Sequence, residues 1–145
     1  MVEFDREHLL IEKKQVGHEL VPYKAMIVDD SAFMVKNLDR ILKSFEVEVL
    51  CTASNGLEAV ENFKKHKDEL DFCTLDITMP EMNGIEALEK MLEIDPKFKI
   101  MMVSAMGQKE TVKKCIQLGA KHFIVKPFQR DKVHGVLESV LGLAH

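Results

Sequence analysis

Short apolar runs alternate with amphipathic stretches along the chain from residue 24 onward. The apolar runs, which we interpret as strands, cover residues 25–28, 47–51, 72–75, 100–103 and 122–125. Between them apolar residues recur at helical spacing, as Met34, Leu38 and Ile41 do. Nearly continuous apolar strands are typical of a parallel sheet that is covered on both faces. Five strand–helix units with right-handed crossovers predict a doubly wound α/β domain.

Local signals mark the ends of several predicted helices. Ser31 stands where the N-cap of the first helix belongs, and the second helix is expected over residues 55–67. The third helix should follow Gly84 and stop at Asp95-Pro96. Gly119 is a candidate C-cap for the fourth.

The N-terminal 23 residues precede the first strand and give a weaker signal. They mix apolar residues with charges, and Pro22 bounds them. A helix over residues 5–15 is one interpretation, and both a docked extension and a frayed tail stay open. We therefore predict an N-terminal extension over 1–23 and a single domain over 24–145.

Composition excludes several classes of protein. The net charge of the 145 residues is −4, which gives no reason to expect nucleic-acid binding. No apolar run reaches the roughly 18 to 20 residues that cross a bilayer, and the N-terminus does not resemble a signal peptide. Cys51, Cys73 and Cys115 lie far apart, which argues against disulfides or a zinc site. We expect a monomeric cytoplasmic protein with reduced thiols.

Polar residues follow four of the predicted strands directly. Asp29 and Asp30 end the first strand, Asp76 the third, Ser104 the fourth and Lys126 the fifth. Ligands of open α/β sheets bind beyond the carboxyl ends of the strands, so these side chains are expected to converge. Asp29-Asp30, Ser104 and Lys126 each have an ordinary interpretation alone, as a solvated acid pair, a helix cap and a surface charge. Asp76 is different, because an acid that ends an apolar strand needs partners. The coincidence of all five at strand ends favours a functional site.

Three carboxylates at one sheet edge repel each other. Two charges about 4 Å apart interact by roughly 4 kcal/mol at an effective dielectric near 20. Either one carboxyl group is protonated or a cation fills the site, and an all-oxygen site suits Mg²⁺. A hydroxyl donor and an ammonium suit an anion beside the metal, so the set predicts a site for a phosphoryl group.

Four segments resemble the signature of the response-regulator receiver family, of CheY type. They are 26–31, 76–84, 103–105 and 125–128, which read MIVDDS, DITMPEMNG, VSA and VKPF. The similarity extends over about residues 24–141. It implies the flavodoxin-like strand order 2-1-3-4-5, for which CheY is a standard example.

The resemblance also implies roles at the metal. Asp76 matches the phospho-accepting aspartate, Asp30 a direct metal ligand and Asp29 an acid that acts on the metal through water. Thr78 matches the residue whose backbone carbonyl completes the metal shell, and its side chain lies where the family tunes hydrolysis of the phosphoaspartate.

Further roles concern the switch. Ser104 matches the hydroxyl that moves to the phosphoryl oxygen, and Lys126 the cation that pairs with it. Phe123 matches the aromatic switch residue, and Pro127 a proline that usually follows a cis peptide bond. Ser104 replaces the commoner threonine, Phe123 a tyrosine, and Asn83 a frequent aspartate, but none of these departures removes a catalytic group.

The function implied by the resemblance is that of a stand-alone response regulator rather than an enzyme with a separate substrate. A sensor histidine kinase of CheA type would be its phosphoryl donor, and a flagellar motor switch protein a candidate target. A dedicated phosphatase is a further candidate partner. Residues 108–132 carry seven basic and two acidic residues, which indicates a face for an acidic partner segment.

Three other functions would use similar residues. A stand-alone phosphorelay intermediate would have the same site. A Mg²⁺-dependent aspartyl phosphohydrolase would place its nucleophile after the first strand with a second aspartate two residues on, whereas position 78 here is threonine. A flavodoxin-like FMN protein is disfavoured because Asp29-Asp30 would repel a phosphate and the chain lacks tryptophan.

Overall fold

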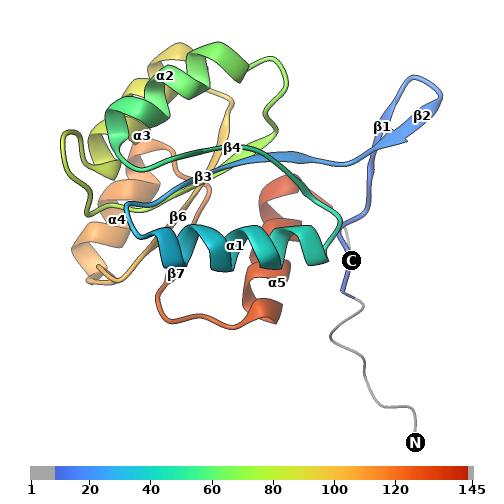
Figure 1. The fold of residues 1–145 in the computed structure, drawn as a ribbon. Coiled ribbons are helices and arrows are strands. Elements are labelled where there is room, and N and C mark those ends of the chain that lie inside the picture. Colours follow the sequence, from blue (N-terminus) through green and yellow to red (C-terminus); the bar gives the residue numbers. More distant parts are fainter. Residues whose placement is uncertain (1–8, 144–145) are drawn as a thin grey trace, which may run out of the picture.

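The computed structural model describes residues 9–143, and within them five parallel strands form one sheet in the order β4-β3-β5-β6-β7 (Figure 1). The strands are β3 (Lys24–Val28), β4 (Glu48–Ala53), β5 (Phe72–Leu75), β6 (Lys99–Ser104) and β7 (His122–Val125). Numbered within this sheet, the order is 2-1-3-4-5. The predicted doubly wound, flavodoxin-like fold is therefore confirmed.

The helices begin and end at the residues that local signals predict, within a few positions. They are α1 (Ala32–Ser44), α2 (Gly56–His66), α3 (Gly84–Ile94), α4 (Lys109–Leu118) and α5 (Arg130–Leu141). The Ser31 side chain accepts a hydrogen bond from the backbone N–H of Met34, as an N-cap does. Gly119 ends α4 with a φ of 116°, which confirms the predicted C-cap. No helix among the described residues is both long and apolar enough to span a bilayer.

Side chains of the strands alternate between two apolar clusters, one on each face of the sheet. In β3, Met26 and Val28 pack into the first cluster, whereas Ala25 and Ile27 pack into the second. Helices α2, α3 and α4 cover the first face, and α1 and α5 cover the second. This double coverage explains why β5 is buried along its whole length.

The N-terminal extension contains a β-hairpin instead of the helix considered for residues 5–15. Strands β1 (Lys14–Val16) and β2 (Glu19–Val21) pair antiparallel, and residues 9–13 have no regular structure. The part of that prediction that covers 9–15 is wrong, and residues 5–8 lie outside the described chain. The reason is the two-residue connection, in which Gly17 adopts a φ of 60° that favours a hairpin turn.

Gly84 permits a close approach between α3 and the end of β5. Its N–H donates to the Ile77 carbonyl at 2.8 Å, and a Cβ at this position would overlap the carbonyl oxygen of Asp76. Only a residue without a side chain fits, because the obstructing atom belongs to the backbone. The close packing at Gly84 therefore helps to fix the backbone position of Asp76, the residue that follows β5.

We predict that Gly84→Ala destabilises the fold by at least about 2 kcal/mol, because relieving the overlap requires the backbone to move. The matched control is Gly135→Ala in the interior of α5, where a new Cβ meets no atom within 4 Å. This control should stabilise the protein by about 0.5–1 kcal/mol through helix propensity. Urea unfolding measures both changes, and equal midpoints for the two variants would contradict the assignment.

Candidate functional site

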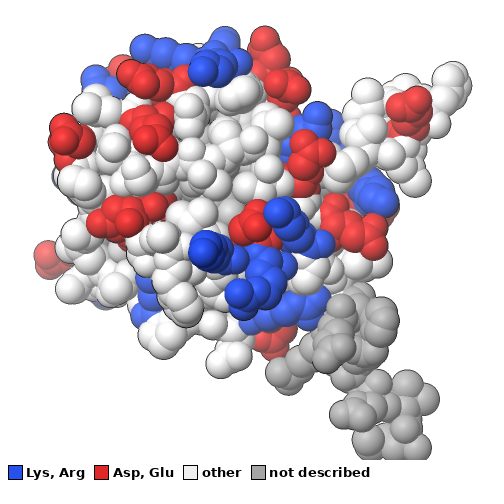
Figure 2. Space-filling model, in the orientation of Figure 1, with Lys and Arg blue, Asp and Glu red and all other residues white. Residues whose placement is uncertain are grey.

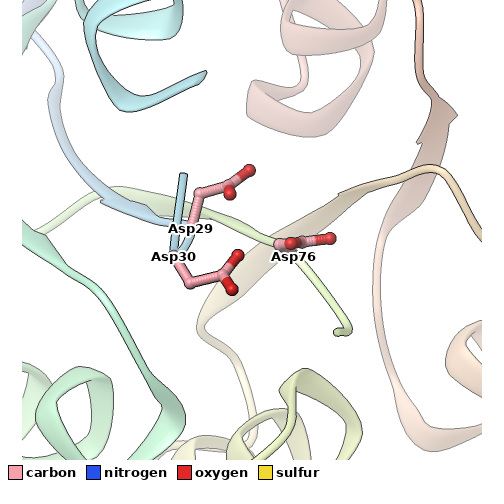
Figure 3. A group of neighbouring side chains, drawn as sticks. All are labelled: Asp29, Asp30 and Asp76. Carbon is pink, nitrogen blue, oxygen red and sulfur yellow. The ribbon is translucent and has the colours of Figure 1, made fainter. Parts of the chain in front are cut away.

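Three carboxylates meet at the carboxyl edge of the sheet. Asp29 and Asp30 follow β3, and Asp76 follows the neighbouring strand β5. One oxygen from each lies within 4.8 Å of the others, and the three side chains extend toward a common space (Figure 3). Asp29 and Asp76 are only 3% and 6% exposed, whereas Asp30 faces solvent. The sheet therefore brings together the three acids that the sequence predicts.

Lys126 brings an ammonium group to the two buried acids. Its Nζ lies 2.7 Å from Oδ2 of Asp29 and 3.7 Å from Oδ2 of Asp76. The lysine backbone is fixed by a 2.9 Å hydrogen bond from its N–H to the Ser104 carbonyl, and the peptide bond to Pro127 is cis, as the resemblance implies. The ammonium thus pairs mainly with Asp29 and lies within reach of Asp76.

The environment of Asp76 raises the pKa of its carboxyl group. Burial is the main cause, and the negative charge of Asp29 adds to it. The Lys126 ammonium, the Ile77 N–H and the Ser104 hydroxyl act in the opposite direction. One of these contacts is a 2.8 Å hydrogen bond from the Ile77 N–H to Asp76 Oδ1. The balance leaves an acid whose charged form is disfavoured unless further positive charge is present.

Two loops meet through Met106 beside the acids. Ser104 ends β6 and is almost fully buried, and its Oγ accepts a hydrogen bond from the Met106 N–H at 3.2 Å. Thr78 Oγ1 donates to Met106 Sδ at 3.1 Å. Met106 therefore connects the loop after β6 with the loop after β5. The sequence places Met106 near the site but contains no signal for its contact with Thr78.

The predicted switch residue Phe123 lies in β7 and is 9% exposed. It belongs to the apolar cluster between the sheet and helices α2, α3 and α4, so it packs on that face of the sheet. β7 pairs with β6, where Phe123 is the register partner of Met102 and Val125 is that of Ser104.

Two pockets flank the acids, and sequence reasoning found neither. One of about 290 Å³ includes Asp29, Asp30 and Glu58 in its lining. The other, of about 410 Å³, lies beside Lys126 and is lined in part by Phe33 and Phe128. Phe33 is 75% exposed at the start of α1. In the sequence, Phe33 falls outside the helical spacing of Met34, Leu38 and Ile41, which is a signal that could have pointed to this pocket.

The donor set fits a hard dication. All nearby ligand atoms from the three acids are oxygens, and Lys126 compensates only one of the three negative charges. Two negative charges remain, which a divalent cation would neutralise. Oxygen donors without nitrogen or sulfur favour Mg²⁺ or Ca²⁺ over transition metals.

Comparisons with known proteins agree with this geometry. The response regulator receiver domain family matches residues 25–138. The chain is 48% identical to the chemotaxis protein CheY of Treponema pallidum over 120 residues, which are 83% of each chain. It is also 48% identical to CheY of Bacillus subtilis over 120 residues, 83% of this chain and 98% of that protein.

Solved structures agree as well. The fold superposes with a TM-score of 0.82 on a chain of the CheX–CheY–BeF3–Mg²⁺ complex from Borrelia burgdorferi, at 45% identity over 83% of this chain and 90% of the other. The family match covers more than half of the chain. The chain therefore belongs to the response regulator receiver domain family, as a CheY-like member.

Proposed function

We propose that this chain is a single-domain response regulator that accepts a phosphoryl group on Asp76. The observation that carries the proposal is the convergence of Asp29, Asp30, Asp76 and Lys126 at one edge of the sheet. The CheY relatives are chemotaxis proteins, which supports a role in chemotaxis signalling. In this role the chain acts as a signalling switch and catalyses only its own phosphorylation and dephosphorylation.

The proposed step transfers a phosphoryl group from a phosphohistidine of a partner kinase. A carboxylate oxygen of Asp76 attacks phosphorus, the nitrogen–phosphorus bond breaks, and the histidine leaves with its bonding electrons. Lys126 would pair with an oxygen of the new acyl phosphate. Its Nζ already lies close enough for this, 3.7 Å from Oδ2 of Asp76. The Ser104 hydroxyl would donate to another oxygen.

Mg²⁺ is the proposed cofactor, held by Asp29, Asp30, Asp76 and the backbone carbonyl of Thr78. When bound, it supplies positive charge to the phosphoryl oxygens. The raised pKa of Asp76 supports this assignment, because the charged carboxylate needs more positive charge than Lys126 provides. The solved complex that contains CheY with BeF3 and Mg²⁺ supports it further.

The proposed partner surface consists of α4, β7 and α5, which are adjacent in the fold. Its lysines are exposed, and among them lie Ile116 and Val125, exposed by 44% and 46%. Figure 2 also shows Lys and Arg side chains gathered over α1 and α5. A surface that combines exposed apolar and basic side chains suits an acidic protein segment. A flagellar motor switch protein is the proposed target, and a CheX-like phosphatase is a further candidate.

Incubation with Mg²⁺ and acetyl phosphate tests the acceptor. We expect wild type to gain one phosphoryl group by intact mass, in an acid-stable and alkali-labile form, and Asp76→Asn to gain none. Asp68→Asn, which changes an exposed aspartate, is the matched control and should label like wild type. Equal labelling of the Asp76→Asn variant would defeat the proposal.

The charge balance predicts how stability depends on pH without metal. Because the folded state raises the pKa of Asp76, it binds this proton more tightly than the unfolded state does. The free energy of unfolding should therefore fall as pH rises from the ordinary value of 3.8 through the raised one. The Asp76→Asn variant does not have this loss of unfolding free energy. In EDTA at pH 7 the variant should therefore be more stable than wild type. The difference should vanish below the ordinary pKa.

Added Mg²⁺ should reverse this order at pH 7. At a concentration one hundredfold above the dissociation constant, binding stabilises the folded state by about 2.7 kcal/mol. Wild type should gain this stabilisation, and Asp76→Asn much less of it. Thermal unfolding at several Mg²⁺ concentrations measures the effect, and equal shifts for both proteins would rule out Asp76 as a ligand.

A further inference from the structure

The segment before the hairpin is docked on the fold. In this segment, residues 9–13, which we call the arm, Ile11 is only 3% exposed. It belongs to the cluster that includes Phe45 and Val47 beyond α1 and the apolar face of α5. The Ile11 N–H donates to the Phe45 carbonyl at 3.1 Å. The arm therefore supplies a core side chain and a backbone hydrogen bond at the C-terminal end of α1.

The arm also contacts α5 directly. His134 Nε2 donates to the Leu10 carbonyl at 2.6 Å, and the His134 ring lies edge-on to Phe45 with centroids 5.1 Å apart. One turn earlier in α5, the Arg130 guanidinium lies 5.0 Å from the centre of the Phe45 ring, and its Nε donates to Ser44 Oγ at 3.0 Å. These contacts form one connected junction around Phe45, which joins the arm, the C-terminal end of α1 and the first half of α5.

Two ion pairs follow this junction along the chain, at the C-terminal end of the arm and the base of the hairpin. Lys13 Nζ lies 3.1 Å from Glu46, and Lys14 Nζ lies 2.6 Å from Asp71. The other carboxylate oxygen of Asp71 accepts the Lys24 N–H at 2.8 Å, which closes the base of the hairpin. Beyond this base the hairpin stands away from the domain (Figure 1). The arm is therefore attached to the domain at Leu10, Ile11 and Lys13, and the base of the hairpin that follows is attached through Asp71.

We propose that the arm is a clamp that controls the mobility of α5 and of the loop that joins it to Lys126. Only residues 127–129 separate Lys126 from the first residue of α5. Loosening α5 at Arg130 and His134 therefore loosens the segment that carries the site lysine. Under the proposed function, on which this consequence rests, the clamp links the N-terminal segment to the partner surface and to Lys126.

The physical basis is local opening. A helix opens more readily when side chains that pack against it are lost. Residues in one contacting cluster are coupled, so a substitution at one of them changes the stability of the others' packing. Truncating Ile11 removes a buried side chain from the apolar cluster that the arm shares with α1 and α5. Leu10 is a matched neighbour, since its side chain is 49% exposed and its carbonyl, which bonds His134, is retained in any variant.

Hydrogen–deuterium exchange of the full chain, read by mass spectrometry, tests the clamp. We expect Ile11→Ala to raise exchange about tenfold in peptides that cover residues 126–138, and Leu10→Ala to leave these peptides unchanged. The α3 peptides, on the other face of the sheet, should stay as in wild type. A rise confined to the arm, with α5 unchanged, would overturn the proposal.

A milder variant covers the case in which Ile11→Ala loosens the whole domain. Ile11→Val removes one methyl group and should raise exchange in α5 more than in α3 or β6. Equal increases in all three elements would also overturn the clamp. The measurement needs no phosphoryl group, and the Asp76→Asn background should give the same pattern. Failure of the clamp and failure of the proposed acceptor are therefore told apart.

Discussion

The concentration of negative charge at one edge of the sheet is the constraint on which the rest of the structure depends. Asp29, Asp30 and Asp76 lie within 4.8 Å of one another, and one ammonium group, that of Lys126, opposes them. Such an arrangement is unfavourable by itself and persists only because rigid elements hold its members. Buried strands carry the acids, and Gly84 lets α3 approach the backbone of Asp76. The stability of the domain therefore maintains the arrangement of charges at its site.

Most of the site could be predicted from the sequence because its residues lie at the ends of buried strands. A strand such as 72–75 is recognisable from its apolar run, and the next residue must then stand at the carboxyl edge of the sheet. Helix starts were also predictable where a short polar side chain caps the first turn, as Ser31 does. In both cases the determining interactions are local, so a pattern of a few neighbouring residues is sufficient.

Other features depend on contacts between distant residues, which no local pattern encodes. The preference of Lys126 for Asp29 over Asp76 is a choice between two carboxylates on adjacent strands. The contact of Thr78 with Met106 depends on the rotamers of two loop residues. The arm was ambiguous because the burial of Ile11 depends on Phe45, which lies more than thirty positions later. A local signal did exist for the hairpin, in Gly17, but the mixture of apolar and charged residues before it was also compatible with a helix.

The position of β5 within the sheet has a consequence for how such domains diverge. β5 is the middle strand of five, and all four of its residues are buried. β7 and the helices beside it lie at the edge, where Val125 and Ile116 face solvent. Substitutions at the edge can accumulate without repacking the centre. Under the proposed function, a lineage can therefore exchange one binding partner for another while Asp76 and the buried strand before it stay the same.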